Sequence, residues 1–185
     1  MGMTMMEHGH CRDAMVMGLM ALSAVSCRPE ARPASDGSVD SAARVDQTAK
    51  AQSAAGHYSI QDFGRLRWLE GSWRGQLPDG GHFYERYRFL DDSTIAMRGF
   101  ADSTFTRATD SASITMRGGT VTDEGVGARW AATRLDSSVV DFASVQGPSN
   151  SFSWARESPD RWTATLHSGD RKRPPTVYRM ERVRR

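Results

Sequence analysis

The chain has 185 residues and a formal net charge of +2 at pH 7, a balance that indicates neither a nucleic-acid-binding protein nor a strongly acidic chain. Its two cysteines, Cys11 and Cys27, lie near the start, so the remaining chain has no disulfide framework and no cysteine-based metal site. A fold there must be stabilised by burial of a core, which about 125 residues can supply.

An apolar run near the start of the chain, Ala14–Val25, follows Arg12. It is shorter than the roughly 20 residues that a helix needs to span a bilayer, but it has the length of the apolar region of a signal peptide. We therefore predict a signal peptide over residues 1–26.

The end of this run, Ala24-Val25-Ser26-Cys27, resembles a bacterial lipobox, in which the cysteine carries the lipid. The next residue, Arg28, is not the Asp that retains many lipoproteins in the inner membrane. The resemblance implies a cell-envelope lipoprotein, attached to the outer membrane through Cys27. Ala24 and Ser26 also suit an ordinary signal peptidase, which leaves a secreted or periplasmic protein as one alternative and a cytosolic protein as another.

Residues 27–57 have the composition of a disordered tether. The stretch from Arg28 to Gly56 has no aromatic residue, and Val39 and Val45 are its only large aliphatic residues. Such a segment buries too little apolar surface to offset the entropy lost on ordering. We therefore place the folded domain over residues 58–185.

The domain begins with four apolar residues spaced three apart: Ile60, Phe63, Leu66 and Leu69. This spacing predicts one or two helical turns that cap one end of a barrel.

Beyond Trp73 the hydrophobic pattern alternates, as it does in strands with one buried face. Turn signals separate the alternating segments: Pro78–Gly81, Asp91–Ser93, Arg117–Gly119, Asp123–Gly125, Asp136–Ser138, Gly147–Asn150, Ser158–Asp160 and Ser168–Asp170. Short strands at a spacing of roughly 8–12 residues indicate a sandwich or a barrel. We predict an all-β protein, an antiparallel up-and-down barrel of about 8–10 strands behind a short N-terminal capping helix.

Two motifs carry a resemblance to a known family: Leu66-x-Trp68-Leu69-x-Gly71-x-Trp73 and the later Glu85-x-Tyr87. The stretch from Ile60 to Val183 resembles the lipocalin-like bacterial domains catalogued as domain of unknown function 6265, and more distantly the lipocalins and other calycins.

In lipocalins the Trp of the Gly-x-Trp motif packs at the closed end of the barrel against an Arg of the last strand. The resemblance therefore implies structural roles for Gly71, Trp73 and Arg182, with the guanidinium of Arg182 stacked on Trp73.

One segment departs from the family pattern. Members often carry a Phe-Glu-Asn-Pro…His-Asp-Phe-Pro stretch before a late strand, whereas the segment Phe142–Phe152 here lacks its Glu, His and Asp. Haem binding of the nitrobindin type needs a His ligand, but alternation places His82 and His167 on the outer face. The domain histidines have no metal-ligand spacing either, so we expect neither a metal nor a cofactor.

The most informative polar residue is Glu85, because Tyr87 and Phe89 share its face of a predicted strand. A carboxylate on an apolar face is costly unless it is paired or hydrogen-bonded. Glu85 either anchors a basic or hydroxyl group of a ligand, or it has an internal partner such as Arg98 or Arg129.

Inward aromatic residues decide what the barrel contains. Trp130, Phe142 and Trp154, together with Glu85, Tyr87 and Phe89, would line a cavity for a small apolar ligand. The same aromatic residues would equally fill a solid core.

These patterns leave three hypotheses for the function. The first is a monomeric exported lipoprotein that binds a small hydrophobic ligand, and the second is a structural or protein-interaction module of the cell envelope with a filled core. A hydrolase or isomerase that uses Glu85 as acid or base is a weaker third, since no Gly-x-Ser-x-Gly motif occurs.

The anchor prediction is tested by Cys27→Ser in the full chain. If Cys27 carries the lipid, the variant leaves the membrane fraction and enters the soluble fraction of the envelope. Fractionation followed by immunoblotting measures the change, with Cys11→Ser as the matched control. Unchanged partitioning of Cys27→Ser would contradict lipidation at that residue.

Overall fold

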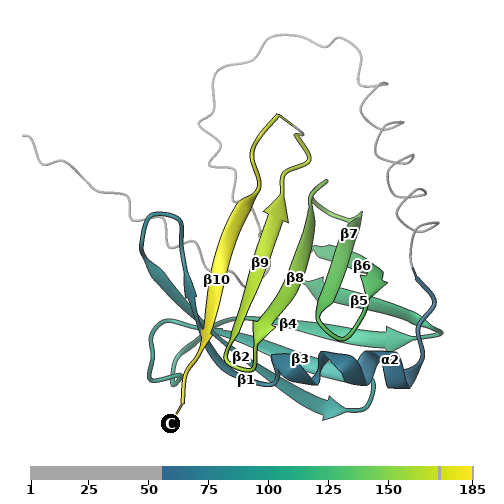
Figure 1. Ribbon diagram of the computed structural model, residues 1–185, viewed down its shortest axis with the longest axis horizontal. Helices are drawn as coiled ribbons and strands as arrows, with labels where there is room; N and C mark the ends of the chain where they lie inside the picture. Colours follow the sequence, from purple (N-terminus) through teal and green to yellow (C-terminus); the bar gives the residue numbers. More distant parts are fainter. Residues whose placement is uncertain (1–55, 171, 185) are drawn as a thin grey trace, which may run out of the picture.

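The computed structural model describes residues 56–170 and 172–184. The predicted signal peptide, the predicted lipidation site Cys27 and residues 28–55 of the predicted tether lie outside the described residues. The described chain forms two short helical segments followed by one closed β-sheet (Figure 1).

The sheet has ten strands, and each pairs antiparallel with the next along the chain while β10 closes on β1. The strands are β1 (Gly71–Gln76), β2 (His82–Asp91), β3 (Thr94–Phe100), β4 (Ala108–Arg117), β5 (Thr120–Gly125), β6 (Ala128–Leu135), β7 (Val139–Gln146), β8 (Ser151–Ser158), β9 (Arg161–His167) and β10 (Thr176–Arg182). The predicted fold class, an all-β up-and-down antiparallel barrel behind a short helix, is confirmed.

Alternation in the sequence places the core inside the barrel. In β2 the side chains of Phe83, Glu85 and Tyr87 are buried, whereas Arg88 is exposed on the outer face. Because successive side chains point to opposite faces of a strand, one face of β2 supplies the interior and the other faces solvent.

The predicted turns lie between strands or begin on the last residue of a strand, with one exception. Asp123 and Glu124 belong to β5, and the chain turns two residues beyond them. The turn uses Gly127, whose φ of +72° is open to glycine but strained for other residues. The prediction of a turn at Asp123–Gly125 is therefore wrong.

The helical lead-in is an α-helix, α2 (Ile60–Gly64), that continues as a 3₁₀-helix, η1 (Arg65–Leu69). Ser59 starts α2 with a capping box, in which its hydroxyl accepts from the Asp62 backbone N–H and the Asp62 carboxylate accepts from the Ser59 backbone N–H.

The lead-in contains the four apolar residues that the sequence spaces three apart, and three of them are buried. Leu66 and Leu69 share one face because a 3₁₀-helix repeats every three residues, and Phe63 is buried beside them. Ile60 lies in the α-helical first turn, where a step of three residues rotates a side chain by about 60° away from the shared face. Its side chain is 49% exposed, so the prediction that it shares the buried face of the other three residues is wrong.

The lead-in packs against one end of the barrel, where β1 begins and β10 ends. The indole of Trp162 lies 5.8 Å from that of Trp68 and 5.9 Å from that of Trp73, both edge-to-face. The Phe63 ring contacts Phe89 of β2 in the same geometry at 5.9 Å. Buried and half-buried rings from the lead-in and from three strands thus close this end of the barrel.

Arg182, in the last strand β10, stabilises the closed end of the barrel. Its backbone pairs with that of Trp73 across the β1–β10 seam, and its guanidinium carbon lies 4.2 Å from the centre of the Trp73 ring. The same guanidinium donates to the carbonyls of Glu70 at 2.7 Å, Trp68 at 3.2 Å and Pro159 at 3.2 Å. The predicted stack of Arg182 on Trp73 is confirmed, and the guanidinium also binds main-chain oxygens at the end of η1.

Gly71 makes room for this contact. Its φ is +135°, and a Cβ atom at this position would collide with the guanidinium of Arg182. Only glycine combines this backbone conformation with the close approach of the arginine.

We expect Arg182→Ala to lower the free energy of unfolding by about 2–4 kcal/mol, because it removes charge-assisted hydrogen bonds and exposes carbonyls at the closed end. Urea unfolding followed by tryptophan fluorescence measures the loss. Arg179→Ala, on the exposed face of the same strand, is the matched control and should change stability by no more than about 0.5 kcal/mol. Equal unfolding midpoints for the two variants would contradict the role of Arg182.

Candidate functional site

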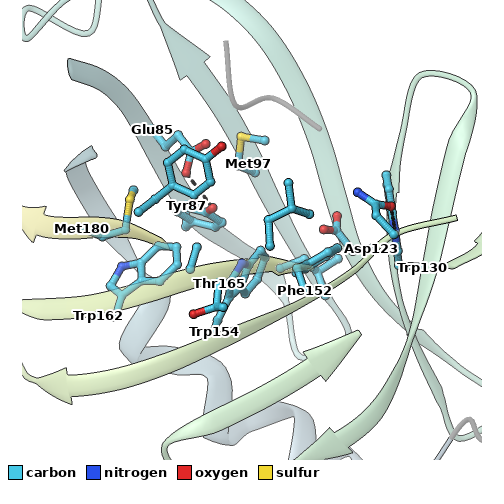
Figure 2. A pocket seen from close by; sticks show the side chains of 15 residues that line it. Glu85, Tyr87, Met97, Asp123, Trp130, Phe152, Trp154, Trp162, Thr165 and Met180 are labelled. Carbon is cyan, nitrogen blue, oxygen red and sulfur yellow. Dashed lines mark hydrogen bonds between the residues drawn. The ribbon is translucent and has the colours of Figure 1, made fainter. Parts of the chain in front are cut away.

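A cavity lies inside the barrel, between the closed end and the opposite mouth (Figure 2). Its volume is about 50 Å³, taken as the space open to the centres of water-sized spheres. By that measure one water molecule needs about 10–15 Å³, so the cavity holds several waters or a small organic group. It is lined by Glu85, Tyr87, Met97, Ile114, Asp123, Trp130, Asn150, Phe152, Trp154, Trp162, Ala164, Thr165, Leu166, Tyr178 and Met180.

The mouth lies at the end of the barrel away from η1. Phe152, Thr165 and Leu166, near the start of β8 and the end of β9, are only half-buried, whereas Trp162 at the other end of β9 is 2% exposed. Asn150, from the β7–β8 turn, accepts a hydrogen bond at 2.9 Å from the indole N–H of Trp130 and holds that ring at the mouth.

Aromatic rings form one wall of the cavity. Trp154 of β8 contacts Trp162 of β9 at 5.6 Å and Tyr87 of β2 at 6.0 Å, both edge-to-face. Phe152 lies 5.4 Å from Trp154 and extends the wall toward the mouth. This wall offers apolar surface and ring faces to any group that enters.

Glu85 is the first of two buried carboxyl groups in the lining, and it is 3% exposed. The Tyr87 hydroxyl donates to its Oε2 at 2.8 Å, since the two residues are two positions apart on one strand face. Burial raises the pKa of Glu85 from 4.5 to about 8, against the lowering effect of the Tyr87 bond, and the nearby Asp123 and Asp110 raise it further. Burial also raises the pKa of Tyr87 well above 10.0, so its hydroxyl remains a donor.

The expectation that Arg98 or Arg129 satisfies Glu85 is wrong. Arg98 is exposed on the outer face of β3, and Arg129 pairs with Glu124 at 3.9 Å on the outer face. Both arginines directly follow or precede an inward residue, so strand alternation turns them away from the interior. In the described part of the chain, Glu85 makes no ion pair.

Asp123 is the second buried carboxyl, and it was not among the predicted site residues. It is 3% exposed, on β5, and lines the cavity from another strand than Glu85 (Figure 2). Burial raises its pKa from 3.8 to about 7, with a further rise from the charge of Glu124 and a lowering from the Glu124 backbone N–H. The signal that could have found it is the spacing of two from Val121, whose side chain is fully buried on the same strand.

A third acid, Asp110, lies near the start of β4, where its backbone pairs with Gly99. It is half-buried; its Oδ2 is buried and makes no hydrogen bond among the described residues. Burial raises the pKa of Asp110 above 3.8, and its charge raises the pKa of Glu85. The charges of the acidic groups on β4 and β5 therefore raise the pKa of the acidic group on β2 across the interior.

The structure brings four of the six predicted ligand-binding residues together in the lining: Glu85, Tyr87, Trp130 and Trp154. Phe89 and Phe142 are not part of it, which corrects their placement. Phe89 lies at the closed end, under the guanidinium of Arg67 at 4.5 Å, and Phe142 packs behind Phe152 at 4.8 Å.

The histidines contribute nothing to the interior. His57, His82 and His167 are exposed, as alternation predicts for the last two. Within residues 56–170 and 172–184, no group of three or more His, Cys, Asp or Glu residues could hold a metal ion. The same residues include no helix that is long and apolar enough to cross a membrane.

No protein-family model and no curated protein matches this chain. A solved structure of a mutant of the fluorescent protein UnaG is similar at a TM-score of 0.44 and 11% identity, over 65% of this chain and 99% of that one. A redesigned β-barrel has a TM-score of 0.32 and 10% identity, over 64% and 93% of the two chains. EF1p2_mFAP2b bound to DFHBI has a TM-score of 0.30 and 14% identity, over 68% and 100%.

These likenesses are remote.

The raised pKa values of Glu85 and Asp123 predict how stability depends on pH. The folded state holds protons on these groups that the unfolded chain releases above about pH 4–5, so stability is full below the unfolded pKa and is lost as pH rises through the folded pKa values of about 7 and about 8. We expect the free energy of unfolding to fall between about pH 5 and 8, with a limiting slope of about 1.4 kcal/mol per pH unit for each group.

Glu85→Gln removes one of these groups and should flatten the fall, so that the variant gains stability relative to the wild type as the pH rises to 8. Urea unfolding at a series of pH values measures how the free energy of unfolding changes with pH. Glu157→Gln, at an exposed position of β8 outside the cavity lining, is the matched control and should keep the wild-type slope. A wild-type slope in Glu85→Gln would show that Glu85 is not buried with a raised pKa.

Proposed function

We propose that the protein binds a small, mostly apolar ligand inside the barrel, with Glu85 and its neighbours as the polar contacts. One observation carries the proposal: the described interior contains a cavity whose wall is aromatic and whose polar groups converge on it from several strands. Concave, mainly apolar pockets with a few convergent polar groups are the usual form of small-molecule sites.

The arrangement of the barrel supports entry of a ligand into the cavity from one end. The closed end is occupied by rings and by the guanidinium of Arg182, while half-buried residues surround the mouth at the other end. A ligand that enters there meets Phe152 and Leu166 first and the carboxyl of Glu85 deeper inside.

The size of the cavity favours a second candidate, a barrel that acts as a structural or protein-interaction module. A volume of about 50 Å³ leaves most of the interior to side chains, including Trp130, Trp154 and Trp162. The ligand of the first candidate is accordingly small, or it displaces a side chain at the mouth such as Phe152.

The location and family of the protein are part of the proposal. The apolar run at residues 14–25 and the Ala24-Val25-Ser26-Cys27 sequence support an exported lipoprotein of the cell envelope, with a monomeric barrel held by a tether. The motif residues Trp73, Glu85 and Tyr87 support membership of the lipocalin-like domain of unknown function 6265.

A binding experiment with 2-phenylethanol, 2-phenylethylamine and 3-phenylpropanoate tests the ligand-binding function. These compounds share a phenyl ring and differ in the polar group. We expect at least one to give a saturable change in tryptophan fluorescence, because Trp154 and Trp162 line the cavity. Ala164→Leu replaces a small lining side chain by a larger one that occupies part of the cavity, and it should weaken that binding at least about tenfold.

Ala155→Leu is the matched control, since it adds the same volume one residue beyond Trp154 on the outer face of β8. Melting temperatures show that both variants are folded. Binding that survives in Ala164→Leu, or no binding of any of the three compounds to the wild type, would favour the filled barrel.

A further inference from the structure

When its side chains ionise, the lining of the cavity can carry only negative charge. Glu85 and Asp123 are its ionisable acids, Asp110 lies close enough to raise the pKa of Glu85, and the lining contains no Lys, Arg or His. The other polar lining groups are neutral, namely Tyr87, Tyr178 and residues at the mouth such as Asn150.

This arrangement is costly without a counter-ion. A buried carboxylate is stabilised by a cation or by several hydrogen bonds, and removal from water otherwise favours its neutral form. Glu85 accepts a hydrogen bond from the Tyr87 hydroxyl, and Asp123 and Asp110 each accept one from the backbone N–H of the next residue. Among the described residues no ion pair reaches any of the three acids. The interior therefore has an unmet preference for positive charge.

The rings beside the carboxyls favour the same sign of charge. Tyr87, Trp154 and Trp162 contact each other edge-to-face and form a partial box beside Glu85. The face of an aromatic ring is electron-rich and attracts a cation within about 6 Å of its centre. Sites that bind an organic ammonium group commonly combine the faces of aromatic rings with a carboxylate.

We propose that the cavity is a site for the ammonium group of a small organic amine, with Glu85 and Asp123 as the counter-charges and Tyr87, Trp154 and Trp162 as the surrounding rings. The inference rests on the proposed ligand-binding function and specifies the ligand class. The apolar part of the amine points to the mouth, where Phe152 and Leu166 provide apolar contacts.

Other ligand classes fit the interior less well. A fatty acid or another organic anion would place a second negative charge beside Glu85 and Asp123, and no cationic group of the lining would offset it. A neutral alcohol can bond to a protonated Glu85, but it gains nothing from the charge of the ring faces and the carboxylates.

Binding of an amine is coupled to ionisation of the acids. An ammonium ion binds the carboxylate form, so any proton on Glu85 or Asp123 leaves to solvent when the amine enters. Because the pKa values of the two groups are about 8 and about 7, affinity for an amine should rise as pH increases from 6 to 8. Two further acids act on them: the charge of Asp110 raises the pKa of Glu85, and that of Glu124 raises the pKa of Asp123. Tyr87 and Tyr178 also line the cavity, and burial raises the pKa of both tyrosines above 10.0.

The test ranks the three phenyl compounds against the wild-type protein by calorimetry at pH 8. A primary alkylamine stays protonated there, since its pKa is about 10, as in lysine. We expect 2-phenylethylamine to bind at least about tenfold more tightly than 2-phenylethanol, and 3-phenylpropanoate to bind most weakly.

Variants then locate the counter-charges. Glu85→Gln and Asp123→Asn should each remove most of the preference for the amine over the alcohol. Glu157→Gln is the matched control, because it removes a carboxyl at an exposed position of β8 outside the cavity lining, and it should keep the full preference.

The outcomes separate the two proposals. If the alcohol or the carboxylate binds as tightly as the amine, the inference is overturned while the ligand-binding function stands. If none of the three compounds binds, both fail. Should a variant not fold, the wild-type ranking and its rise between pH 6 and 8 still decide the question.

Discussion

The pairing of β1 with β10 turns a ten-strand sheet into a barrel, and the interior depends on this seam. Arg182 fixes the seam at one end only, where its guanidinium lies over Trp73 and binds carbonyls of the helical lead-in. Since that end is filled by rings, space inside the barrel remains only toward the other end. The position of the cavity is thus a consequence of how the barrel closes.

The interior holds acids that a folded protein would ordinarily exclude. Burial of Glu85 and Asp123 raises their pKa values, and the folded state is least stable when both are ionised. Stability and binding therefore respond to pH in opposite directions: protonation favours the empty fold, whereas ionisation favours a bound cation. A ligand that supplies positive charge would relieve the cost that the empty barrel carries at neutral pH.

Much of the fold could be predicted from the sequence, because alternation and turn signals act locally. The face shared by Phe83, Glu85 and Tyr87 follows from a period of two, and the resemblance to lipocalins correctly implied the contact of Trp73 with Arg182. Asp123 was missed because Asp-Glu-Gly is also a common turn sequence, and its role depends on where β5 ends. The volume of the cavity depends on how rings from different strands meet, which no local pattern contains.

Carbon-13 NMR titration of the side-chain carboxyls of Glu85 and Asp123, without and with 2-phenylethylamine, tests the central claim most directly. In the free protein the two groups should titrate near pH 8 and pH 7, well above their ordinary values of 4.5 and 3.8. With saturating amine both midpoints should fall, since the ammonium ion stabilises the carboxylates. Ordinary midpoints in the free protein, or midpoints that the amine leaves unchanged, would contradict an acidic cavity that binds cations.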